Sequence, residues 1–155
     1  MERIEKIDFS LINIIRTIDG YEPTSAFYEF LVQARKESFN YLVDRVWGGW
    51  DEDLQRKIFL EETTGQQPYI IFYKNQPIGS YCLTKAEDCY YFENFFILPK
   101  YQQKGIGTFV LKKALEVADK VKLPVRLIYW NFNPSRSLYE KMGFEIVSKF
   151  FVELL

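Results

Sequence analysis

The feature that most constrains this chain is an apolar strand that runs into a glycine-rich turn and then directly into a helix. Residues 90–98 read Tyr-Tyr-Phe-Glu-Asn-Phe-Phe-Ile-Leu, a nearly unbroken aromatic and aliphatic run that is typical of a buried strand. Pro99 cannot donate a hydrogen bond to a sheet, so we expect the strand to end before it. From Ile106 to Val121 apolar residues recur at helical spacing. This pattern predicts an amphipathic helix that packs on a sheet.

The turn has the properties of an anion site. Gly105 and Gly107 leave the backbone bare at the start of the predicted helix, where free N–H groups attract negative charge. We therefore predict a phosphate or pyrophosphate ligand, with a purely structural strand-to-helix corner as the alternative. A dinucleotide-binding fingerprint would need a third glycine where Val110 stands, and the Gly-Lys-Ser/Thr of a P-loop is absent.

The other elements follow from apolar runs and turn residues. Because a strand, a helix and another strand of these lengths require a right-handed crossover, we expect one parallel strand pair within an otherwise antiparallel sheet. We expect residues 1–10 to form an N-terminal extension and residues 11–155 a single domain. The predicted elements are strands at 11–17, 68–73, 78–84, 90–98, 125–130 and 144–154, a helix that begins at Thr24 or Ser25, a second helix from Asp51, the helix from Ile106, and a short helix between Pro134 and Gly143.

Composition excludes several kinds of protein. The 155 residues carry a net charge of −1, which gives no electrostatic case for nucleic acid, and the apolar run Leu11–Ile15 is too short for a membrane span. We expect a soluble cytoplasmic protein. The chain has no histidine, which removes Ser-His-Asp and Cys-His sites and histidine-based zinc sites. Cys82 and Cys89 are expected to be buried thiols, with a disulfide as the alternative.

Two motifs together resemble a known family. Gln102-x-x-Gly105-x-Gly107 after an apolar strand resembles the coenzyme A pyrophosphate loop of the GNAT superfamily of N-acetyltransferases, and Asn133-Pro-x-Arg-x-Leu-Tyr-Glu-Lys-x-Gly-Phe144 resembles its C-terminal motif. The resemblance implies an α/β (α+β) fold. Its sheet is mixed and mostly antiparallel, with one parallel strand pair splayed at the cofactor site and helices on both faces.

The resemblance also implies a reaction and a binding site. The reaction is transfer of an acetyl group from acetyl-CoA to a primary amine, by direct attack in a ternary complex and without a metal. The alternative is a sensor or interaction module that binds acetyl-CoA or CoA without catalysis. The residues implied to bind the cofactor are Phe95, Phe96 and Ile97 on the central strand, Gln102, Gln103, Lys104, Gly105, Ile106, Gly107 and Thr108 at the loop, and Asn133.

Two residues are catalytic candidates. Tyr139 matches the tyrosine that the family places to protonate the departing thiolate, although it could also be an ordinary helix residue packed on the core. Glu93 is the nearest candidate base, because Tyr129 and Trp130 occupy the region where some relatives have a glutamate. Glu93 could instead pair with Arg126, and ordered water could replace it as the base. By strand alternation, Tyr91, Glu93 and Phe95 would share a face.

Residues 20–65 are expected to form the binding site for the amine acceptor. The stretch Val46-Trp-Gly-Gly-Trp-Asp51 could form a mobile aromatic wall over a cleft or a buried helix corner. Asp51 is expected to cap a helix rather than bind metal with Asp53. Asp44, Asp51 and Glu52 would favour a cationic amine. Edge strands at the ends of the sheet are compatible with a homodimer.

Overall fold

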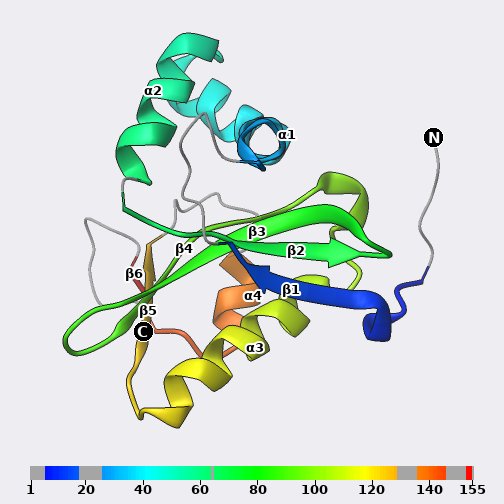
Figure 1. Cartoon of the computed structure of the whole chain (residues 1–155). Coiled ribbons are helices and arrows are strands. Elements are labelled where there is room, and N and C mark those ends of the chain that lie inside the picture. The colour runs from blue at the N-terminus through cyan, green and yellow to red at the C-terminus, as the bar shows by residue number, and fades with distance from the viewer. Residues whose placement is uncertain (1–5, 18–25, 64, 129–135, 146–152, 155) are drawn as a thin grey trace. The chain divides into compact units, whose positions relative to one another are not determined.

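The computed structural model describes residues 6–17, 26–63, 65–128, 136–145 and 153–154 (Figure 1). It divides into two compact units. The first comprises Met1–Cys82 and Asn94–Gln102, and the second comprises Leu83–Glu93 and Gln103–Leu155. The chain passes between the units within two strands and again between Gln102 and Gln103, and each unit is described separately.

The first unit combines antiparallel strands with two helices. Its elements are η1 (Phe9–Leu11), β1 (Ile12–Arg16), α1 (Tyr28–Trp47), α2 (Glu52–Glu62), β2 (Tyr69–Tyr73), the larger part of β3 (Gln76–Lys85), the second half of β4 (Tyr90–Ile97), and η2 (Pro99–Tyr101). β1 pairs with β2 from Ile12 opposite Tyr73 to Arg16 opposite Tyr69, and β2 pairs with β3. The predicted strands and the helix after Asp51 are confirmed; Thr24 and Ser25 lie outside the described residues.

The turn between β2 and β3 is tighter than the sequence suggested. Lys74 and Asn75 have φ values of 50° and 64°, and Tyr73 pairs directly with Gln76. This is the geometry of a two-residue hairpin whose twist matches that of its strands. The strand expected at 78–84 therefore begins two residues earlier, since Gln76 and Pro77 belong to β3. Pro77 is tolerated there because the register shifts between Ile71 and Phe72, which marks a bulge.

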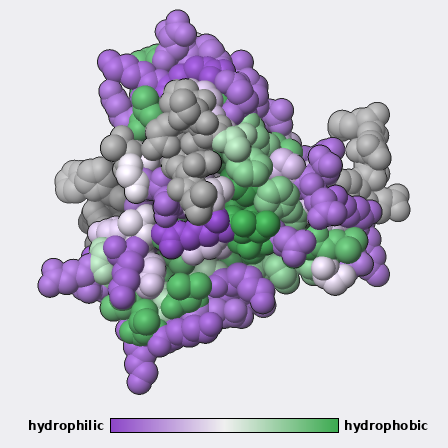
Figure 2. Space-filling view, in the orientation of Figure 1, coloured by the Kyte–Doolittle hydropathy of each residue, from purple (hydrophilic) through white to green (hydrophobic). Residues whose placement is uncertain are grey.

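The core of the first unit joins both helices to its strands. A buried cluster combines side chains of α1, α2, β2, β3 and β4, among them Leu31, Phe59, Ile70, Cys82 and Phe96. α2 exposes the charged side chains of Asp53, Lys57 and Glu61 together with Leu54 and Leu60, and the upper part of the surface in Figure 2 is largely, though not entirely, hydrophilic. On its inner side α2 buries Gln55 and Phe59.

The second unit contains the predicted crossover. It consists of the first half of β4, α3 (Ile106–Lys120), β5 (Val125–Ile128), α4 (Arg136–Lys141) and β6 (Glu153–Leu154). β4 pairs with β5 in parallel, with Tyr90 opposite Val125 and Tyr91 opposite Arg126 as the register pairs among the described residues. α3 buries Ile106, Val110, Leu111, Ala114 and Ala118 at the expected helical spacing.

Within the described residues, six strands lie in the order β1-β2-β3-β4-β5-β6, and β4–β5 is the parallel pair. The mixed, mostly antiparallel α/β fold is therefore confirmed. Residues preceding β1 are engaged with the first unit, since Ile7 is buried and the Asp8 N–H donates to the Tyr73 hydroxyl at 3.2 Å. No helix in the described part of the chain has the length and apolar character to cross a membrane.

Candidate functional site

β4 carries one more residue than the stretch of β3 that it pairs with. At one end of this hairpin the Ala86 N–H donates to the Cys89 carbonyl, and at the other the Leu98 N–H donates to the Ile78 carbonyl, both at 2.8 Å. Ala86 and Ile78 are eight positions apart in the sequence, whereas Cys89 and Leu98 are nine positions apart. The two counts would be equal in a regular antiparallel ladder. β4 therefore contains a one-residue bulge, a feature that is over-represented next to active sites.

The bulge lies at Asn94. This residue has φ of 54° in the middle of β4, a left-handed backbone that is uncommon outside glycine and in which asparagine is enriched. Its side-chain Nδ2 donates to Oε1 of Gln66 at 3.0 Å. Alternation of side chains requires extended backbone, and Asn94 departs from it between Glu93 and Phe95. That these two residues share a face stays a prediction.

Gly79 allows β3 to approach β4 closely beside this bulge. A Cβ atom built on Gly79 would collide with the carbonyl oxygen of Phe96 and lie 3.2 Å from the Cα of Ile97. Glycine is the residue without a Cβ, so the close approach requires it. The sequence analysis missed this residue, and the available signal was a glycine inside an otherwise apolar strand.

The turn after β4 is braced by Gln102. Its side-chain Nε2 donates to the Ile97 carbonyl at 2.8 Å, and its backbone N–H donates to the Pro99 carbonyl at 3.1 Å. The structure thus brings together two residues of the predicted cofactor site, Ile97 and Gln102. Gln102 fixes the shape of the turn that leads to the glycine loop.

α3 begins in a glycine N-cap. Gly105 has φ of 87° and Gln103 has φ of 58°, so the loop turns sharply before the helix. The first intrahelical bond runs from the Phe109 N–H to the Gly105 carbonyl at 3.1 Å. The N–H groups of the first turn, Ile106, Gly107 and Thr108, therefore have no acceptor within the helix. The buried Ile106 side chain anchors this turn, while half-buried Lys104 precedes it. The arrangement suits a phosphate, because donors, the helix dipole and a lysine charge occur together.

The two catalytic candidates lie in the second unit. Tyr139 on α4 is 5% exposed and packs edge-to-face on Phe144, with ring centroids 6.0 Å apart. Glu93 on β4 is half-buried. Arg126 forms an ion pair with Asp88 at 3.9 Å, and the pKa of Arg126 is raised by its hydrogen bond to Tyr91 and by the charge of Asp88. The catalytic roles of Tyr139 and Glu93 stay predictions.

The remaining site residues are distributed over both units. Phe95, Phe96, Ile97 and Gln102 belong to the first unit, and the residues from Gln103 to Thr108 belong to the second. Phe95, Phe96 and Ile97 have buried side chains, so their backbone is what they could offer a ligand. Asn133, Tyr129 and Trp130 lie outside the described residues.

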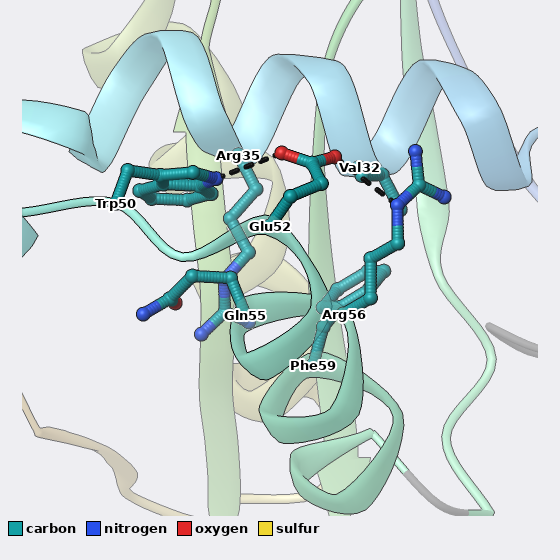
Figure 3. Close-up of a pocket in the computed structure, with 7 residues that line it drawn as sticks. All are labelled: Val32, Arg35, Trp50, Glu52, Gln55, Arg56 and Phe59. Atoms are coloured by element: carbon teal, nitrogen blue, oxygen red, sulfur yellow. Dashed lines mark hydrogen bonds and ion pairs between the residues drawn. The ribbon is translucent and has the colours of Figure 1, made fainter.

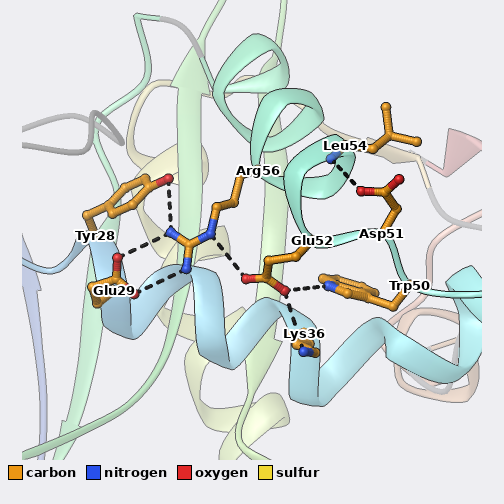
Figure 4. Close-up of polar contacts among 8 residues, drawn as sticks. All are labelled: Tyr28, Glu29, Lys36, Trp50, Asp51, Glu52, Leu54 and Arg56. Carbon is orange, nitrogen blue, oxygen red and sulfur yellow. Dashed lines mark hydrogen bonds and ion pairs between the residues drawn. The ribbon is translucent and has the colours of Figure 1, made fainter.

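A charged network joins α1 to α2 (Figure 4). The Arg56 guanidinium binds both carboxylate oxygens of Glu29, at 3.2 and 3.3 Å, and Glu52 at 3.1 Å. Glu52 also accepts from the Trp50 indole N–H at 3.0 Å and pairs with Lys36 at 3.4 Å. The Trp50 hydrogen bond, aided by Arg56 and Lys36, lowers the pKa of Glu52. Hydrogen bonding to Glu29 chiefly raises the pKa of Arg56.

The described side chains of α1 and α2 leave only a small cavity between them. A cavity of about 10 Å³ lies there, lined by Val32, Arg35, Trp50, Glu52, Gln55, Arg56 and Phe59 (Figure 3). This volume holds about one water molecule and no larger acceptor. Trp50 lines this cavity and is half-buried, whereas the Trp47 and Asp44 side chains are outside the described part of the structure. Both interpretations of the stretch 46–51 stay predictions.

The acidic residues at this joint have structural partners. The Asp51 side chain accepts from the Leu54 N–H at 3.1 Å and caps α2, as predicted. Glu52 is held by three donors, so these two carboxylates give no support to a cationic acceptor. Within the described residues no group of three potential ligands could hold a metal ion. Cys82 and Cys89 are both buried free thiols, which confirms the expectation.

A comparison with models of protein families shows which family the chain belongs to. Residues 26–144 match the model of the acetyltransferase (GNAT) family. The chain belongs to this family. Comparison with curated proteins gives no match.

Many solved structures share the fold of this GNAT protein. A putative acetyltransferase from Pyrococcus horikoshii has a TM-score of 0.64 and 20% identity over 94% of this chain and 47% of that one, so our chain spans about half of that protein. The PaiA N-acetyltransferase from Thermoplasma acidophilum, in complex with coenzyme A, has a TM-score of 0.67 and 19% identity over 92% and 96% of the two chains. A GNAT acetyltransferase from Elizabethkingia anophelis with acetyl-CoA bound has a TM-score of 0.60 and 22% identity over 89% and 78%.

Proposed function

We propose that this protein is an N-acetyltransferase that uses acetyl-CoA to acetylate a primary amine. The observation that carries the proposal is the start of α3, where Gly105 leaves the first N–H groups of the helix open for a pyrophosphate. Membership of the acetyltransferase (GNAT) family supports the donor, as do the solved relatives that hold CoA or acetyl-CoA. The acceptor is not specified, and a homodimer remains a prediction.

In this proposal, backbone groups of Phe95, Phe96 and Ile97 bind the pantetheine arm and position the thioester. The buried side chains of these residues and the bulge before them support a backbone role. The N–H groups from Gln103 to Thr108, with the Lys104 charge, bind the pyrophosphate. Asn133 would contact the cofactor near the parted strands.

The proposed reaction is direct attack in a ternary complex. The amine nitrogen attacks the thioester carbonyl carbon, a C–N bond forms, and the C–S bond breaks. Tyr139 donates its hydroxyl proton to the leaving thiolate; the reference pKa values of about 10 for tyrosine and about 8.5 for a thiol make this transfer feasible. The proton lost by the amine passes to Glu93 or to an ordered water molecule. No step requires a metal ion.

A thermal melt with and without acetyl-CoA tests the proposal without knowledge of the acceptor. Ligand at 100 times its dissociation constant adds about 2.7 kcal/mol, which corresponds to a rise of roughly 5–10 °C in a chain of this size. We expect Gly105→Val to remove the shift. Gly48→Val is the matched control, because Gly48 also has a positive φ, of 76°, but lies between α1 and α2.

The outcomes separate the candidate functions. A shift that is lost in Gly105→Val and kept in Gly48→Val supports the site, and CoA release with an amine from a panel then supports the transferase. A shift without turnover for any amine would favour the acetyl-CoA-binding module. Absence of a shift at millimolar acetyl-CoA would refute the site. The glycine turn before α3 would then have only a structural role.

A further inference from the structure

We propose that Gln66 is a positioning residue, which holds the bulge of β4 in the geometry that acetyl transfer requires. The inference rests on the proposed acetyl-CoA function and adds a residue that neither motif contains. Gln66 lies in the segment between α2 and β2, and its Oε1 accepts from Asn94 Nδ2 at 3.0 Å. Asn94 is the residue at which β4 leaves the extended conformation.

The first step of the argument concerns the strained backbone. A non-glycine residue in the left-handed region costs of order 1 kcal/mol or more, and it persists where its surroundings fix it. Asparagine lowers that cost, and the hydrogen bond from Gln66 fixes the side chain. Asn94 immediately precedes Phe95, Phe96 and Ile97, whose backbone is proposed to bind the thioester arm. A change of φ at Asn94 would therefore redirect the N–H and carbonyl groups of all three.

The second step concerns the support of Gln66 itself. Its backbone N–H donates to the Thr63 carbonyl at 3.0 Å. Thr63 is 2% exposed, and its hydroxyl donates to the Phe59 carbonyl at 2.6 Å. Phe59 belongs to the buried cluster of the first unit. The C-terminal end of α2 thus anchors Gln66, and Gln66 in turn anchors Asn94, so a chain of hydrogen bonds connects the bulge to the buried end of this helix.

The test variant is Gln66→Ala, and Gln67→Ala is the matched control, because Gln67 is an exposed neighbour of the same type. We expect Gln66→Ala to lower the rate of acetyl transfer about 10-fold, since small misplacement of reacting groups costs rate steeply. The KM for acetyl-CoA should change less than about threefold, because pyrophosphate binding at the α3 loop is untouched. Gln67→Ala should keep the wild-type rate.

Rescue distinguishes positioning from general stabilisation. Gln66→Glu keeps an oxygen acceptor for Asn94 Nδ2 and should retain the wild-type rate. The double variant Gln66→Glu, Asn94→Asp places two acceptors opposite each other, and no orientation of the side chains restores a hydrogen bond. We expect it to lose at least as much rate as Gln66→Ala.

Hydrogen exchange gives a readout that does not depend on the acceptor. In the wild type, acetyl-CoA should protect amides both at 95–97 and at 103–108. In Gln66→Ala, protection at 95–97 should fall while protection at 103–108 persists. Equal protection at 95–97 in both proteins would overturn the inference, as would a wild-type transfer rate in Gln66→Ala. Absence of protection at 103–108 in the wild type would instead refute the proposed cofactor site.

Discussion

Replacement of Gly79 by alanine should destabilise the protein and disturb the strand that is proposed to bind acetyl-CoA. The added Cβ would collide with the Phe96 carbonyl oxygen, and it would lie 3.2 Å from Ile97 Cα and 3.3 Å from Ile71 Cδ1. Two of these three atoms are backbone, so β4 must move away from β3. No rotation of a flexible side chain can relieve the overlap.

The magnitude follows from two opposing effects. Overpacking of this kind lowers the free energy of unfolding by up to about 3 kcal/mol. We expect a value near the upper end, because backbone atoms must move. Loss of a glycine restricts the unfolded chain and returns about 0.4–1 kcal/mol. The net cost of about 2 kcal/mol should lower the melting midpoint by roughly 4–8 °C.

Urea unfolding at 25 °C and thermal melts measure this cost directly. Because the displaced atoms belong to Phe96 and Ile97, Gly79→Ala should also weaken the protection of amides 95–97 by acetyl-CoA. Gly143→Ala is a useful comparison. Gly143 has φ of 93°, and no atom lies within 4 Å of its Cβ position. The loss of stability in this variant should therefore come from backbone strain alone. A midpoint for Gly79→Ala equal to or above that of the wild type would refute the close approach of β3 and β4.

Three further variants address the other proposed roles. Tyr139→Phe should keep the acetyl-CoA melting shift and lower kcat; equal loss of affinity and turnover would argue for a packing role alone. Arg56→Lys removes the bidentate contact of the guanidinium with both carboxylate oxygens of Glu29. Because the Glu29 side chain is 70% exposed, we expect the free energy of unfolding to fall by less than about 1 kcal/mol, and by still less at ~1 M salt. Because the folded-state pKa of Glu52 is lowered, its stabilisation is complete above its unfolded pKa and disappears as the pH falls through the folded value. The difference in unfolding free energy between wild type and Glu52→Gln should therefore shrink as the pH falls below the ordinary glutamate pKa of about 4.5, and a difference that widens on acidification would contradict the assignment.

Local sequence patterns were sufficient for most elements and for the class of fold. The strand of residues 90–97 and the helix from Ile106 have strong periodic signals, and Pro99 and Asp51 act through their own backbone and side-chain chemistry. The parallel β4–β5 pair followed from the length of the crossover alone. These features depend on residues that are near in sequence, which is why sequence could predict them.

The sequence alone therefore determined the order of the elements, the glycine turn at Gly105 and the family motifs. Only the tertiary structure decided where β4 bends, which residue holds that bend and why Gly79 must be glycine. These facts depend on pairing between strands and on a contact between Gln66 and Asn94, 28 positions apart in the chain. A bulge is an extra residue in one strand relative to its partner, so the residue pattern of either strand alone does not reveal it.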